Sequence, residues 1–109
     1  GLGINHLVHS GENFNSSHHL YLTRIPGISD ETRREIIIKL AERGVNTNVH
    51  YKPLPMMTAY KEMGWDIKDF PNAYAYYENL ITLPLHTKLS DEDVEYVIEN
   101  FKEVVKEYM

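Results

Sequence analysis

Three polar side chains occupy every second position of one short segment, and these residues are the best placed in the chain to bind a ligand. They are Asn46, Asn48 and His50, which alternate with Val45, Thr47, Val49 and Tyr51. The alternation predicts a β-strand over 45–51, with the polar side chains about 7 Å apart on one face. Amide and imidazole groups in such a row could bind hydroxyls, phosphates or carboxylates. A sheet face exposed to water gives the same alternation, so both interpretations stay open.

Other types of reactive site are not indicated. The six histidines belong to no HExxH or comparable motif, and the chain has no cysteine to complete a zinc site. There is no glycine-rich phosphate loop, no GxSxG turn and no nucleophile paired with a base. We therefore expect no metal ligand and no catalytic residue within this chain.

The composition limits the partners of the chain. Hydrophobic residues make up 42% and charged residues 25% of its 109 residues, as in an ordinary folded domain. The net charge is −5 and no basic patch is visible, which argues against nucleic acid as a partner. No apolar run is long enough to span a membrane. The absence of cysteine fits a cytoplasmic protein, and we expect that location.

The elements that must position the polar row follow from the periodicity and the turn residues. Strands are expected over 19–25, 45–51 and 80–83, and helices over 30–43, 56–63, 71–79 and 91–108. Ser29 and Ser90 are expected to cap two of these helices, each followed by acidic residues in the first turn. Residues 1–17 have no regular period and are interpreted as a linker or flexible arm. The predicted fold class is α+β, with a small three-stranded sheet covered by helices on one face.

Five runs of residues carry a further indication. In chain order they are SHHLYLTR at 17–24, RGVNTNVHYKPL at 43–54, FPNA at 70–73, LPLH at 83–86 and LSDEDV at 89–94. In order and spacing they resemble the closing part of the DegT/StrS-type sugar aminotransferases. The resemblance covers residues 18–109, and it implies the C-terminal small domain of an aspartate-aminotransferase-like, fold type I enzyme.

The resemblance also implies an activity for a longer parent enzyme. Such enzymes use pyridoxal phosphate to transfer an amino group, usually from glutamate, to a keto group of a nucleotide-linked sugar in polysaccharide or glycoconjugate synthesis. Their cofactor lysine lies in a large N-terminal domain, and they are typically homodimers. No lysine of this chain matches the motif of that lysine, so the chain alone is expected to bind no cofactor and to be inactive.

The same resemblance selects candidate substrate-binding residues. The small domain closes over the cofactor from one side, and by resemblance this role falls on the end of the 45–51 segment. His50 is the first candidate, followed by Asn48 and Tyr51. Two alternatives remain open: a stand-alone α+β module that binds a small ligand or regulates another protein, and a structural or dimerising domain.

Overall fold

The structure is a computed structural model that describes residues 1–109. The strands are β1 (Asn5–His6), β2 (Ser10–Gly11), β3 (Phe14–Asn15), β4 (Tyr21–Arg24) and β5 (Leu80–Leu83). The α-helices are α1 (Asp30–Glu42), α2 (Thr58–Glu62), α3 (Pro71–Tyr77) and α4 (Asp91–Lys106). Two short 3₁₀ helices, η1 (Leu54–Met56) and η2 (Ile67–Asp69), flank α2. The predicted α+β class is confirmed.

A three-stranded antiparallel sheet lies at the centre of the molecule, in the order β1-β4-β5. The prediction that 45–51 is its third strand is wrong. That segment meets the sheet at a single bridge, where Asn48 pairs with Thr82 on β5. Pro53 has no backbone N–H to donate, and the chain leaves the sheet as it approaches that residue. The third strand is instead β1, which pairs Asn5 with Arg24 on β4.

The first 17 residues, interpreted from the sequence as a linker or flexible arm, contain three short strands. β1 joins the central sheet, and β2 and β3 form a small hairpin beside it. The base of the hairpin is joined by a hydrogen bond from the Ser16 backbone amide to the His9 carbonyl, at 2.7 Å. Each strand is two residues long, which is too short for a period in the sequence to show.

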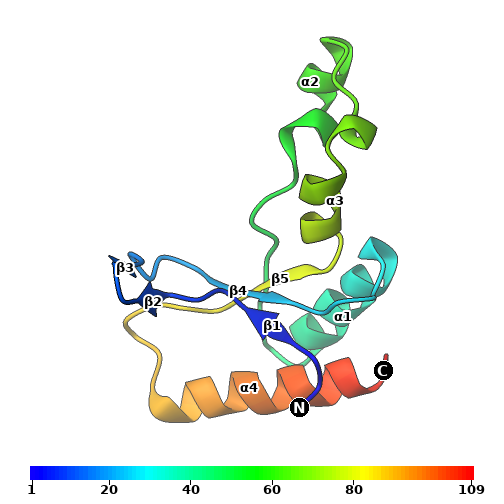
Figure 1. Ribbon diagram of the computed structural model, residues 1–109. Helices are drawn as coiled ribbons and strands as arrows, with labels where there is room; N and C mark the ends of the chain where they lie inside the picture. The colour runs from blue at the N-terminus through cyan, green and yellow to red at the C-terminus, as the bar shows by residue number, and fades with distance from the viewer.

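Helices α1 and α4 pack on one face of the sheet and form the core with it, as Figure 1 shows. Ile36 and Leu40 of α1 are fully buried, and Phe101 and Val104 of α4 are nearly or fully buried. Both predicted caps are present, because the hydroxyl of Ser29 accepts from the Thr32 amide and that of Ser90 from the Asp93 amide. The remaining core residues are Ile25, Val45, Ile81, Leu83 and Val105.

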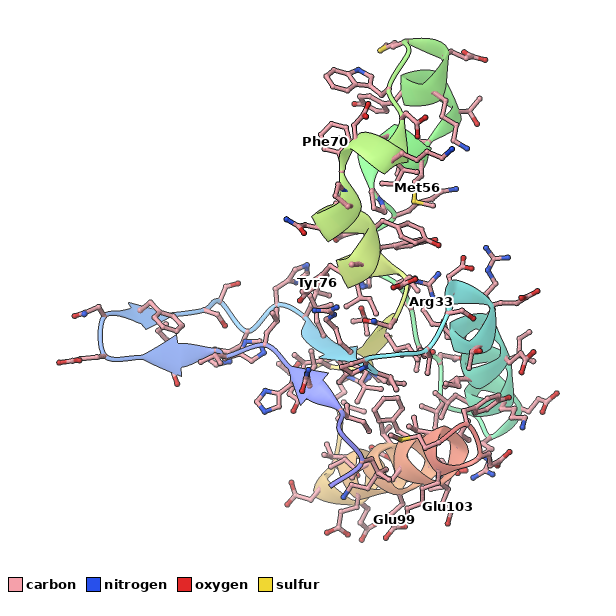
Figure 2. All side chains as sticks on the ribbon, turned by 45° about the vertical axis from the view of Figure 1, so that its right-hand side comes forward. Arg33, Met56, Phe70, Tyr76, Glu99 and Glu103 are labelled. Atoms are coloured by element: carbon pink, nitrogen blue, oxygen red, sulfur yellow. The ribbon has the colours of Figure 1, made fainter.

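Residues 52–77, here called the lobe, project from the body on the side opposite α4 (Figure 1). Two arginines of the body hold its base. Arg24 donates from Nη2 to the carbonyl of Ala75 at 2.8 Å, and its guanidinium stacks on Tyr76. The buried Arg33 donates to the carbonyl of Tyr77 and stacks on the ring of the same residue; Figure 2 shows Arg33 at this junction. Both carbonyls lie at the C-terminal end of α3, where the helix dipole favours positive charge.

None of the helices combines the length and the apolar character needed to cross a membrane.

Candidate functional site

His50 lies where the 45–51 segment leaves the sheet, and it is fixed to β5. The backbones of Asn48 and Thr82 exchange two hydrogen bonds, of 2.7 and 3.1 Å. Two residues further on, Nδ1 of His50 lies 3.0 Å from Oγ1 of Thr82. His50 is half-buried, and its Nε2 is accessible to solvent and has no partner within the chain. The imidazole is therefore held at one nitrogen and free to bind a ligand at the other.

The other two candidate residues differ in how firmly they are held. Asn48 is exposed, and its side-chain oxygen accepts from the backbone amide of Val49 at 2.7 Å. The Tyr51 ring contacts the His50 ring edge-on, with centroids 4.7 Å apart, and is two-thirds exposed. The peptide bond between His50 and Tyr51 is cis. The Tyr51 ring therefore lies against His50, whereas the side-chain amide of Asn48 hydrogen-bonds to the next residue of its own segment.

Asn46 does not belong to the same site. It lines a separate hollow of about 510 Å³ together with His86, Asp93 and Tyr96, at the start of α4. The row of three polar residues expected from the sequence is therefore divided between two places. This follows from the loss of the predicted strand, because only a continuous strand would keep all three side chains on one face.

Thr82 is the residue at this site that sequence reasoning missed. It is the only polar residue of β5, and it is 5% exposed. Its side chain points to the face opposite the core residues Ile81 and Leu83. The sequence offered one signal for this role: Thr82 is the single hydroxyl residue in an otherwise apolar strand. A polar group in such a strand, once buried, needs a hydrogen-bond partner.

The largest apolar hollow lies in the lobe and contains no charged group. Its volume is about 450 Å³. The lining residues are Pro53, Leu54, Pro55, Tyr60, Trp65, Phe70 and Ala73. Trp65 and Phe70 contact each other with ring centroids 5.9 Å apart. Tyr60 is the one ionisable side chain in the lining, and the other lining residues are apolar, so this hollow is suited mainly to burying apolar groups.

Three side chains have a shifted pKa, and none of them contacts His50. Hydrogen bonds from the backbone amide and the hydroxyl of Ser90 lower the pKa of Asp93. Lys39 donates to Glu107 at 2.6 Å, which raises the pKa of Lys39 and lowers that of Glu107. These shifts belong to a helix cap and to an ion pair between α1 and the end of α4, and both are structural roles.

The residues present do not make a pyridoxal-phosphate site. Such a site needs a lysine facing a pocket that can form an imine with the cofactor. Six of the seven lysines are exposed, and the seventh, Lys39, pairs with Glu107. None of the four main hollows has a lysine in its lining. No group of three histidine or carboxylate side chains is placed to hold a metal ion.

Comparison with known proteins places this fold in a family. The sequence profile of the DegT/DnrJ/EryC1/StrS aminotransferase family matches residues 2–102. The match includes the N-terminal strands that the sequence patterns did not reveal. The chain belongs to this aminotransferase family, as the resemblance indicated.

Two curated relatives illustrate the match. The spore coat polysaccharide biosynthesis protein SpsC of Bacillus subtilis is 39% identical over 95 residues, covering 81% of this chain and 23% of that protein. The dTDP-4-dehydro-2,3,6-trideoxy-D-glucose 4-aminotransferase of Saccharopolyspora spinosa is 30% identical over 94 residues, covering 86% and 23%. This chain thus spans about a quarter of the length of these relatives.

Solved structures agree with this assignment. The putative sugar aminotransferase Spr1654 from Streptococcus pneumoniae, in its PMP form, is 55% identical and superposes with a TM-score of 0.95. The match covers 98% of this chain and 27% of that one. The aminotransferase TlmJ from Streptoalloteichus hindustanus is 30% identical with a TM-score of 0.82, over the same shares of the two chains.

Proposed function

We propose that this chain is the C-terminal small domain of a pyridoxal-phosphate-dependent aminotransferase that acts on a nucleotide-linked keto-sugar. The amino donor is glutamate, and the product serves polysaccharide or glycoconjugate synthesis in the cytoplasm. Residues 18–109 form the small domain, and residues 1–17 connect it to a large domain that carries the cofactor lysine. The parent enzyme is a homodimer, and the isolated chain is inactive.

One observation carries this proposal: nearly the whole chain superposes on a quarter of the pneumococcal sugar aminotransferase at 55% identity. A solved PLP form of that protein supports pyridoxal phosphate as the parent's cofactor. The names of two relatives, from Saccharopolyspora spinosa and Aneurinibacillus thermoaerophilus, specify dTDP-linked sugars. A nucleotide-linked sugar is therefore the substrate class we assign to the parent.

Within this function, His50 is the residue we assign to substrate binding. Its free Nε2 can hydrogen-bond a carboxylate of the amino donor or an oxygen of the sugar. Tyr51 covers one edge of the imidazole, and Asn48 holds the preceding backbone on β5. These residues bind and orient the substrate; the cofactor, when bound to the large domain, supplies the amino-group chemistry.

The test uses a chimera in which this chain replaces the matching segment of the Streptococcus pneumoniae protein. We expect the chimera to form 2-oxoglutarate from glutamate when a dTDP-linked keto-sugar is the acceptor. His50→Leu should lower kcat/KM by about 10- to 100-fold, because a lost hydrogen bond to a charged group costs about 1.5–3 kcal/mol. Thr58 is an exposed residue of the lobe, and Thr58→Ala is the control variant, which should leave kcat/KM unchanged.

If the chimera is active and its His50→Leu variant has the same kcat/KM, His50 does not bind the substrate. A chimera that assembles as the native enzyme does and still yields no 2-oxoglutarate would contradict the proposed function itself.

A further inference from the structure

Thr82 and His50 meet on the sheet face opposite the core residues Ile81 and Leu83. Thr82 is held on both sides, by Leu22 of β4 and by Asn48 across the single bridge. Its backbone is therefore held in the sheet, and its hydroxyl lies 3.0 Å from Nδ1 of His50. No other hydrogen bond is made by this hydroxyl within the chain.

The proton positions follow from counting donors and acceptors. A threonine hydroxyl carries one hydrogen that needs an acceptor, and it can also accept. A neutral histidine has one protonated and one bare ring nitrogen. If Nδ1 carried the proton, the hydroxyl would accept it and its own hydrogen would be left without a partner. Thr82 is 5% exposed, so water has little access to supply that partner.

We propose that Thr82 is a positioning residue: its hydroxyl donates to Nδ1 of His50 and so keeps the proton of the neutral imidazole on Nε2. The other ring nitrogen of His50, which makes no hydrogen bond within the chain, is then an N–H donor. A donor of this kind binds oxygen acceptors and cannot accept a hydrogen bond or remove a proton. In substrate binding, which rests on the proposed function, His50 would recognise a carboxylate or a sugar oxygen and would not serve as a base.

The direct test is the tautomer of His50 in this 109-residue chain, read by long-range ¹H–¹⁵N NMR at pH 9, where histidine is neutral. The His50 signals are assigned by their loss in His50→Gln. We expect the Nε2–H form to exceed the Nδ1–H form by about tenfold or more, because an unpaired buried donor is costly. If Nδ1 of His50 carries the proton in the unmodified chain, this spectrum alone overturns the inference.

Two variants of Thr82 distinguish an effect of its hydroxyl on the His50 tautomer from an effect of its packing. Thr82→Val keeps the branched shape and removes the hydroxyl, and its Nδ1 signal should move toward the protonated range. Thr82→Ser keeps the hydroxyl and should restore the signal of the unmodified chain. A Val variant with the Nδ1 signal unchanged, in a chain with the same backbone amide spectrum elsewhere, would also overturn the inference. Because the readout is a tautomer, it is independent of whether the parent transaminates.

Discussion

Arg33 and Arg34 are neighbours on α1 with the same side chain and opposite surroundings. The Arg33 side chain is 3% exposed, donates to the Tyr77 carbonyl and stacks on the Tyr77 ring at 4.3 Å. The Arg34 side chain is 67% exposed and pairs only with Asp30, at 2.9 Å. The first arginine joins the lobe to the body, whereas the second forms a surface ion pair.

We predict that Arg33→Ala lowers the free energy of unfolding by about 2–4 kcal/mol, through an unpaired buried carbonyl and the lost stacking. The matched change Arg34→Ala should cost less than about 1 kcal/mol, as exposed ion pairs do. Urea unfolding of the two variants at neutral pH measures both values. Similar losses in the two variants would show that Arg33 does not hold the lobe.

At the same scale, the sequence pointed to His50 as a candidate but not to Thr82, the residue that we propose positions it. The His-Tyr-x-Pro-Leu resemblance pointed to His50, and the structure gives it a free nitrogen. Thr82 was treated as one residue of a short strand, because its role depends on a contact between segments 32 residues apart. Asn46 was grouped with His50 by alternation, but it lines a hollow at the start of α4 to which His50 does not contribute.

Among the elements, α4 begins with the Ser90 cap that the sequence predicts, and the structure shows that Asp93 completes a capping box with it. The Ser90 hydroxyl accepts from the Asp93 amide at 3.1 Å, and the Asp93 carboxylate accepts from the Ser90 amide at 2.9 Å. Ser90→Ala should destabilise the chain by about 1 kcal/mol, the usual cost of losing such a cap. Denaturant unfolding of this variant checks the value, and no change would show that α4 does not need its cap.

The cap also predicts a pH dependence. The pKa of Asp93 lies below its ordinary value of 3.8 because Ser90 donates to the ionised carboxylate. The stabilisation is therefore present above that value and is lost as pH falls through the lower, folded pKa. Asp93→Asn should lower Tm at pH 7 and have a much smaller effect at pH 2. Equal effects of the substitution at both pH values would contradict this role of the charge.

Elements with strong local signals were predictable, and those that depend on distant pairing were not. The helices α1 and α4, with their serine caps, and the strand β5 appear where the sequence placed them. The 45–51 segment has the alternation of a strand but pairs with β5 at one residue only. β1 is two residues long, and its strand conformation comes from pairing with β4. Strand propensity depends on such neighbours more than on the residues themselves.

On the scale of the whole molecule, the lobe exposes apolar side chains that its own body does not cover. Met63 is 72% exposed, and Trp65 and Leu54 are each just over half exposed. Exposed apolar patches of this kind mark interfaces. If the large domain of the parent covers this surface, the isolated chain should associate with itself through the lobe.

Light scattering at increasing concentration should therefore give a mass above that of the 12.7 kDa monomer. The double change Met63→Ser and Trp65→Ser should return the chain to the monomer mass. Ile38→Ser, which removes a 59% exposed apolar side chain from α1, should not. A chain that stays monomeric at high concentration would contradict this prediction.

The absorbance spectrum after incubation with pyridoxal phosphate and dialysis tests the central claim most directly: that this chain shapes the substrate side of an aminotransferase whose cofactor lysine lies elsewhere. It is recorded for the 109-residue chain and for the chimera with the Streptococcus pneumoniae protein. We predict a retained band near the visible edge in the chimera alone, and its loss when glutamate is added. A retained band in the 109-residue chain, or none in a chimera that has assembled, would contradict the account.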